Sequence, residues 1–166
     1  MSNLSLAEQI AQLAESQVGV HETTENNGPQ ITSYQRATNL EVGEWPWCAA
    51  FVCWVVKQAI IGRKVTFPRP TTAGAWDFER WCRSVDNTVK LKKPPQRDIR
   101  RGDLLVYNFS HIGIAVGPPS ADGIVPTVEG NTSHVGSVDV AADREGDGVY
   151  RKFRKVSQIR SRIRFV

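Results

Sequence analysis

The hydrophobic pattern of this chain changes its period once, near residue 103. Before that point apolar residues recur at helical spacing or fill longer apolar runs, and after it short β-type segments are separated by turn formers. The first pattern predicts helices and the second predicts strands. Helices followed by strands are typical of an α+β domain with an antiparallel sheet. We therefore expect one domain over residues 1–166, with a helical part at about 1–83 and a sheet part at about 103–166.

Three main helices are expected in the first part of the chain. Ser5 and Glu8 have the spacing of a capping box, which marks a helix start. The run CAAFVCWVVKQAI, which begins at Cys48, is apolar on nearly every side, so its helix should be buried. Residues 21–45 are polar and predict a long loop with a short helix around residues 31–37. The main helices are expected between Ser5 and Gly19, between Pro46 and Gly62, and between Thr72 and Arg83.

Six short strands are expected in the second part. They are separated by turn sequences such as GPPSADG and REGDG. In the last of them Arg160, Arg162 and Arg164 alternate with apolar residues and a serine, so the arginines share one face. The expected strands are residues 103–108, 112–116, 124–129, 137–140, 149–153 and 159–166.

Cys48 lies in the first turn of the expected second helix, directly after Trp45, Pro46 and Trp47. Unpaired backbone N–H groups and the helix dipole favour a thiolate at such a position. A thiolate is the nucleophilic form of cysteine, but it needs a base and a third group that orients the base. The alternative is that Cys48 is a small buried hydrophobe, as is usual for a cysteine in an apolar helix.

Three histidines are candidates for the base. His111 lies at the start of an expected strand, where its ring can face a helix terminus. Glu129 and Asn131 follow at the end of the next strand, and if that strand stays extended, both lie on one face. Either can orient an imidazole, and Glu129 is favoured because a carboxylate also stabilises the imidazolium. His134 is the competing base, in a turn without a strand to hold it, and His21 is expected at the surface or at the rim of a cleft.

Three blocks, WPWCAAFV, RRGDLLVYNFSHIGIAVG and VEGNTS, occur in this order. Together they resemble the CHAP family of cysteine-dependent peptidoglycan amidases and peptidases, which is similar to NlpC/P60 and more distantly to papain-like peptidases. The resemblance implies a papain-like fold and acyl transfer at an amide bond of the cell wall, without a metal or cofactor. It implies that Cys48 is the nucleophile, His111 the general base and Glu129 the orienting group, with Asn131 assisting. The scissile bond, either N-acetylmuramoyl–L-alanine or a bond of the stem or cross-bridge peptide, stays open.

The aromatic residues and the other cysteines have structural interpretations beside functional ones. Trp45 and Trp47 either pack against the helix or line a groove that takes a sugar or a peptide. Cys53 is expected in the core, and Cys82 is expected to be a packed thiol.

Four other acidic residues have structural interpretations. Asp103 is interpreted as a residue of the turn that enters its strand. Asp143, Glu145 and Asp147 loosely suggest a calcium loop, but they lack the full EF-hand spacing, so a polar hairpin turn is favoured.

The net charge of +4 is unevenly spread, with basic clusters at residues 90–101 and 150–166. Such clusters are usual on a solvated face, and they also suit an anionic wall polymer. Bacterial peptidoglycan is the expected partner, without nucleic acid and without membrane insertion. If the chain is a secreted effector, an immunity protein is a further expected partner.

The first 20 residues lack the basic start and the apolar core of a secretory signal. We therefore expect synthesis in the cytoplasm and action in the periplasm or cell wall. CHAP-like domains occur in phage lysins, tail-associated enzymes and wall hydrolases, so release through a holin-type pore and injection are both compatible with this sequence.

Two alternatives belong to other functional classes. Cys48, Cys53, Cys82 and the histidines could form a zinc site in a basic nucleic-acid-binding domain, although C-x4-C without a second close pair is a poor zinc pattern. The chain could also be an inactive CHAP-like module that only binds wall peptides.

Overall fold

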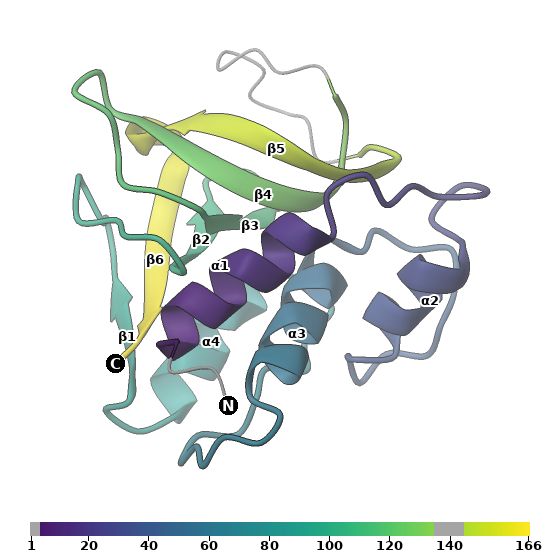
Figure 1. Cartoon of the computed structure of the whole chain (residues 1–166), viewed down its shortest axis with the longest axis horizontal. Coiled ribbons are helices and arrows are strands. Elements are labelled where there is room, and N and C mark those ends of the chain that lie inside the picture. Colours follow the sequence, from purple (N-terminus) through teal and green to yellow (C-terminus); the bar gives the residue numbers. More distant parts are fainter. Residues whose placement is uncertain (1–3, 135–144) are drawn as a thin grey trace.

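The computed structural model describes residues 4–134 and 145–166. These residues form an antiparallel sheet with helices packed against it, which confirms the predicted α+β class (Figure 1). The helices are α1 (Leu6–Ser16), α2 (Pro29–Gln35), α3 (Cys48–Ala59) and α4 (Asp77–Ser84), with a 3-10 turn, η1 (Val156–Gln158). The strands are β1 (Val89–Lys92), β2 (Leu104–Tyr107), β3 (Ile112–Ala115), β4 (Ile124–Thr132), β5 (Gly148–Lys155) and β6 (Ile159–Phe165).

The strand order in the sheet is β1-β6-β2-β3-β4-β5, and every neighbouring pair is antiparallel. Strands β2 to β5 are neighbours both in sequence and in the sheet. β6 returns from η1 and lies between β1 and β2 (Figure 1). Because β3 and β4 are antiparallel, the start of β3 lies beside the end of β4. This pairing brings two of the predicted site segments together.

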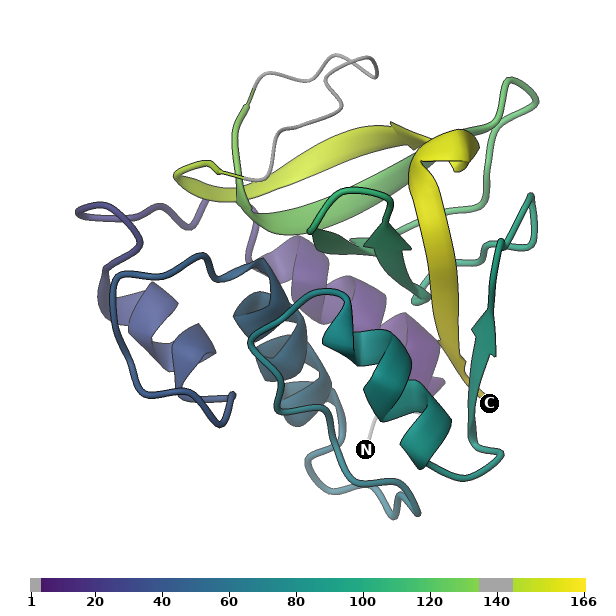
Figure 2. The same cartoon turned by 180° about the vertical axis from the view of Figure 1, so that it is seen from behind.

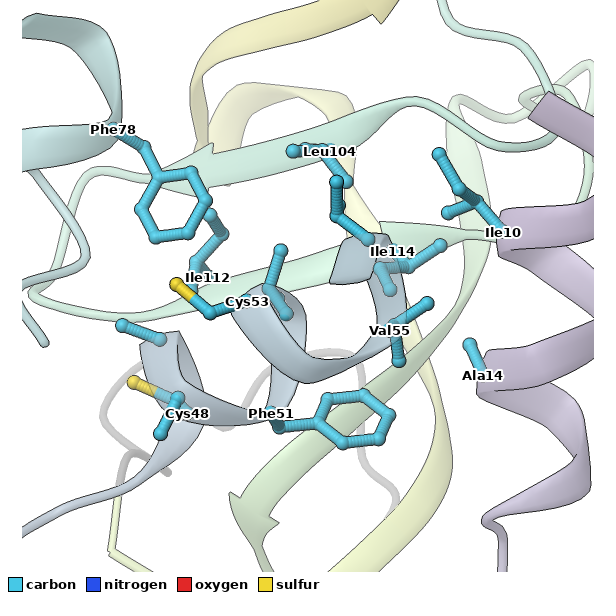
Figure 3. Packing of buried hydrophobic residues seen from close by; sticks show 14 of the residues in the cluster. Ile10, Ala14, Cys48, Phe51, Cys53, Val55, Phe78, Leu104, Ile112 and Ile114 are labelled. Atoms are coloured by element: carbon cyan, nitrogen blue, oxygen red, sulfur yellow. The ribbon is translucent and has the colours of Figure 1, made fainter. Parts of the chain in front are cut away.

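α3 is buried, as its apolar run predicts. It contacts α1, α2, β3 and β4, while α2 lies at the periphery (Figure 2). Side chains of α3 pack near Ile112 and Ile114 of β3 and Ile10 of α1 (Figure 3). Each large apolar side chain that is fully buried contributes about 1.5–3 kcal/mol, so α3 is a central element of the core. No helix in the described part of the chain is both long and apolar enough to cross a bilayer.

Alternate residues of β2 belong to two different apolar clusters. Leu104 and Val106 pack in the larger cluster, together with the helices. Leu105 and Tyr107 belong to a smaller cluster that includes Ile159. Since successive side chains of a strand point to opposite faces, the sheet is buried on both faces along β2, and the smaller cluster supports the site from the face opposite the helices.

Two helices begin later than the sequence predicts. α3 begins at Cys48 rather than at Pro46, because Trp47 has the non-helical dihedrals φ −118° and ψ 18°. Cys48 is therefore the first residue of the helix. α4 begins at Asp77 rather than at Thr72, because the Thr72 hydroxyl accepts a hydrogen bond from the backbone N–H two residues on and stabilises a turn there.

The sheet begins earlier than residue 103. Residues Val89–Lys92 form strand β1, which pairs with β6 at the edge of the sheet. Because of the lysines at 90 and 92, this segment was interpreted as part of a basic cluster and not as a strand. Lysines are nevertheless typical of edge strands, where their charge opposes pairing with strands of other chains. The strand predicted at residues 137–140 lies outside the described residues.

Candidate active site

Cys48 is one of the residues that line a surface pocket. As the first residue of α3, it lies where backbone N–H groups lack acceptors within the helix. Its side chain is mostly buried, with 6% of its surface exposed. The pocket has a volume of about 260 Å³, and its lining consists of Leu40, Trp45, Pro46, Cys48, Ala73, Gly74, Ala75, Ser110 and Glu145. The thiol can therefore be reached by a substrate from the side of these loops.

A second hollow extends this pocket. It has a volume of about 450 Å³, shares Leu40, Ala73 and Gly74 with the first, and continues to Asp77 and Trp81. We call the two hollows together the groove. The described residues that line it include two carboxylates and neither Lys nor Arg, although the chain as a whole has a net charge of +4.

His111 comes directly before β3 and is fully buried. Its Nε2 lies 2.9 Å from Oε2 of Glu129. Because an ionised carboxylate only accepts hydrogen bonds, Nε2 carries the proton of this contact. The other ring nitrogen, Nδ1, makes no hydrogen bond to any described residue, so it is the nitrogen that can exchange a proton with a thiol.

Cys48 lies close enough to His111 to change its protonation. Burial lowers the pKa of His111, but the charge of Cys48 and a hydrogen bond with it, followed by the effect of Glu129, raise that pKa to about 9. Nδ1 of His111 makes no hydrogen bond of standard geometry to a described residue, and catalytic hydrogen bonds are often long or poorly aligned without substrate. Cys48 and His111 are therefore neighbours whose sulfur and imidazole can exchange a proton when this contact tightens.

The Glu129 carboxylate is fully buried and accepts hydrogen bonds from four side chains. The Tyr107 hydroxyl donates at 2.7 Å and the Thr127 hydroxyl at 2.8 Å. Arg154 donates from Nε at 2.8 Å and from Nη2 at 2.6 Å, beside the contact with His111. Burial opposes ionisation of Glu129, but Arg154 and His111 outweigh it and hold its pKa well below the usual range.

Two glycines in the predicted blocks explain why these side chains fit. A Cβ on Gly113 would lie 2.6 Å from Cγ of Glu129 and 2.7 Å from the hydroxyl of Tyr107. A Cβ on Gly130 would lie 2.7 Å from Cβ of Phe51 in α3. Gly113 therefore makes room for the Glu129 side chain, and Gly130 allows β4 to approach α3 closely.

Asn131 is fully buried beside Glu129, but not in the way that an extended strand predicts. Its φ is +55°, and the pairing of β4 with β5 shifts register between Glu129 and Thr132. The extra residue forms a β-bulge, so the spacing of two residues does not define a common face. The condition for a common face, a strand that stays extended through Asn131, is therefore not met.

The two tryptophans differ in position. Trp45 lines the pocket beside Cys48, and its indole N–H donates to the Glu41 carbonyl at 2.8 Å. Trp47 is fully buried, stacks on Tyr34 and donates to Oε1 of Glu22 at 2.7 Å. Of the two interpretations left open for these tryptophans, packing against the helix applies to Trp47, because its side chain is part of the core, and Trp47 therefore does not line the groove as a substrate-binding residue.

The other two histidines lie against Tyr150 of β5. Nδ1 of His21 is 3.2 Å from the Tyr150 hydroxyl, and the ring of His134 is 5.8 Å from the Tyr150 ring. The tyrosine hydroxyl donates to Asp147 at 2.6 Å. Neither contact involves Glu129, so His111 remains the candidate base.

The remaining cysteines are buried thiols, as predicted. Cys53 is fully buried and its Sγ contacts the Thr72 carbonyl at 3.3 Å, while burial raises its pKa to about 12. Burial also raises the pKa of Cys82 to about 11. The described residues contain no group of three or more His, Cys, Asp and Glu side chains that could hold a metal ion, so they supply no ligand set for the zinc alternative.

Asp103 accepts hydrogen bonds from Arg164 and from a backbone N–H of its own turn, as its interpretation as a turn residue predicts. Glu145 lines the pocket and Asp147 bonds to Tyr150. Asp143 lies outside the described residues.

The basic cluster at residues 150–166 is partly buried and partly paired with carboxylates. Lys152, Arg154 and Arg162 are buried. Arg160 pairs with Glu79, and Arg164 pairs with carboxylates on the loop between β1 and β2. Much of this charge is therefore paired within the fold.

Three residues of the site, Tyr107, Thr127 and Arg154, were not predicted from the sequence. The pattern of β5 pointed the other way, because an apolar Phe153 between Lys152 and Arg154 predicts an inward phenylalanine and outward cations. The structure reverses this orientation, with both cations buried and Phe153 53% exposed, and buried cations need buried partners.

Comparison with family models, with curated proteins and with solved structures finds no match for this chain. The geometry of the site therefore carries the functional argument.

Proposed function

We propose that this protein is a papain-like cysteine hydrolase, similar to CHAP enzymes, that cleaves an amide bond of bacterial peptidoglycan. The observation that carries the proposal is the arrangement of Cys48 at the start of α3 next to His111, whose far nitrogen is held by buried Glu129. A nucleophile, a base and an orienting carboxylate in this order are what acyl transfer requires.

The reaction proceeds in two steps. The Cys48 thiolate attacks the amide carbonyl, and protonated His111 gives its proton from Nδ1 to the leaving amine. Backbone N–H groups at the start of α3 are the natural donors to the oxyanion. Water then attacks the thioester while His111 takes its proton, and the carboxylic acid leaves. Throughout, Glu129 fixes the ring and stabilises the imidazolium.

The groove favours a peptide substrate with neutral or cationic groups. Its carboxylates, Asp77 and Glu145, would repel an anionic chain near Cys48. Stem and cross-bridge peptides carry amino groups, so the part of the wall that lies in the groove is expected to be peptide, with Trp45 as an apolar contact. Delivery to the wall through a holin-type pore or by injection belongs to the same proposal.

The test is digestion of purified sacculi by the wild type, by Cys48→Ser and by Cys53→Ser, with products read by mass spectrometry. Wild type and Cys53→Ser should release fragments, because a serine at position 53 can still donate to the Thr72 carbonyl. Cys48→Ser should release at least about a hundredfold less, since the nucleophile is lost. Free glycan strands would indicate an amidase, and shortened stems an endopeptidase.

If sacculi of several chemotypes stay intact with the wild type, or if Cys48→Ser digests them as well as the wild type does, the proposal is wrong. Intact sacculi that nevertheless bind the protein would favour the wall-peptide-binding module instead.

A further inference from the structure

Arg154 lies at the far end of a row of four buried or nearly buried groups. The row runs from Cys48 through His111 and Glu129 to Arg154, and it crosses from α3 to β5. Arg154 is 1% exposed and binds both oxygens of Glu129, at 2.8 Å and 2.6 Å. Its guanidinium also lies over the Tyr107 ring, 5.2 Å from the centroid. Such a two-pronged contact is stronger and more directional than a single hydrogen bond.

We propose that Arg154 is a positioning residue of the site: it balances the charge of Glu129, so that the buried site can hold Cys48 as a thiolate beside a protonated His111. This role deepens the proposed function and rests on it in one respect, the assignment of Cys48 as the nucleophile. It requires no particular substrate.

The charges of the row explain the role. With a thiolate at Cys48, an imidazolium at His111, a carboxylate at Glu129 and a guanidinium at Arg154, the signs alternate and the sum is zero. Without the guanidinium the same state has a net negative charge in a site of low polarity, which is costly. The site then takes up a proton.

That proton goes to Cys48 rather than to Glu129. The hydroxyls of Tyr107 and Thr127 and the Nε2 proton of His111 all donate to the carboxylate. Hydrogen bonds donated to a carboxylate favour its ionised form. Removal of Arg154 is therefore expected to lower the thiolate fraction of Cys48 at neutral pH.

Other titratable groups face the same region. Lys152 on β5 is buried and donates from Nζ to the Ser133 carbonyl at 3.0 Å. Tyr150, also on β5, donates to Asp147. Tyr107 on β2 donates to Glu129. Lys152 is a matched comparison for Arg154, because it is a buried cation on the same strand whose ammonium group bonds to a backbone carbonyl.

The test is the rate of alkylation of Cys48 by iodoacetamide as a function of pH, followed by mass spectrometry of the modified peptide. Arg154→Met is expected to move the midpoint of this profile upward by about one pH unit, which slows alkylation about tenfold below the midpoint. Arg154→Lys keeps the charge and should stay close to the wild-type midpoint. Lys152→Met should shift the midpoint clearly less than Arg154→Met.

A folded Arg154→Met protein with the wild-type profile would overturn the inference. So would an Arg154→Lys profile shifted as far as that of Arg154→Met, because geometry rather than charge would then be responsible. If Arg154→Met does not fold, Arg154→Gln provides the same neutral comparison and retains a donor for Glu129. Alkylation needs no peptidoglycan, so a shifted profile in a protein that leaves sacculi intact would support this role while contradicting the proposed substrate.

Discussion

At the scale of single residues, Glu129 shows why the site has one defined geometry. Its two oxygens accept from Tyr107, from His111, from Thr127 and from Arg154. These donors come from β2, from the residue before β3, from β4 itself and from β5. A buried carboxylate held from several directions cannot rotate without breaking hydrogen bonds, so the ring that it orients is fixed as well.

The space for Glu129 depends on Gly113, and Gly113→Ala should therefore impair the site. The new Cβ would meet Cγ of Glu129 at 2.6 Å, so the carboxylate must move. We expect a loss of about 1–3 kcal/mol in unfolding free energy from overpacking and a loss of at least about tenfold in the digestion rate. Urea unfolding and a sacculus assay measure the two effects.

Gly62→Ala is the control for this substitution. Gly62 has φ +76° and nothing lies within 4 Å of its added Cβ. Strain should lower the unfolding free energy by about 1 kcal/mol, while digestion per folded molecule stays unchanged. Full activity in Gly113→Ala would show that Glu129 does not need its present position.

At the scale of elements, α4 is tied to β6 by a buried carboxylate. Glu79 of α4 accepts at Oε1 from Arg160 at 2.8 Å and from Ser161 at 2.9 Å. The pKa of Glu79 is lowered, since these hydrogen bonds together outweigh the opposing effect of burial. Because the loop before α4 lines the groove, this contact also sets the position of one groove wall.

Glu79→Gln should weaken the attachment of α4 to β6. Loss of the charge is expected to lower the unfolding free energy by about 1.5–3 kcal/mol, as for other hydrogen bonds to charged groups. Asp77→Asn is the control on the same helix, because the Asp77–Arg80 pair is exposed and should contribute less than about 1 kcal/mol. Urea unfolding measures both variants, and equal effects would contradict the anchoring role of Glu79.

At the scale of the whole molecule, carboxylates bound to arginines join distant parts of the chain. Asp98 binds Arg162 and Arg164 of β6, and Glu15 of α1 binds Arg101. Hydrogen bonds from Arg162 and Arg164 hold the pKa of Asp98 below its usual range, and the Arg101 hydrogen bond does the same for Glu15. The basic residues thus stabilise the fold through internal pairs.

These pairs predict acid sensitivity. A carboxyl whose pKa is lower in the folded state stabilises the fold above its unfolded pKa, near 4, and this stabilisation is lost as pH falls through the folded value. The unfolding free energy should therefore be nearly constant from about pH 6 to pH 5 and fall steeply below about pH 4. Asp98→Asn should reduce this slope. Urea unfolding across the range provides the measurement, and a flat profile down to about pH 3 would contradict it.

Several features of the fold could be predicted because they depend on local pattern. The change of period near residue 103 indicates helices followed by strands, and an apolar run of helical length such as that of α3 must be buried wherever it lies. The edge strand β1 was missed because a short segment with two lysines becomes a strand only through its pairing with β6.

The sequence by itself determined that Cys48 lies in the first turn of a buried helix and that His111 and Glu129 belong to successive strand segments. It could not determine that Trp47 turns into the core, that Asn131 lies in a bulge, or that Arg154 binds Glu129. These outcomes depend on the register of β4 against β5 and on the close packing of β4 on α3. Only the tertiary structure decides them, because a contact between residues 25 positions apart in the chain depends on how whole strands pair.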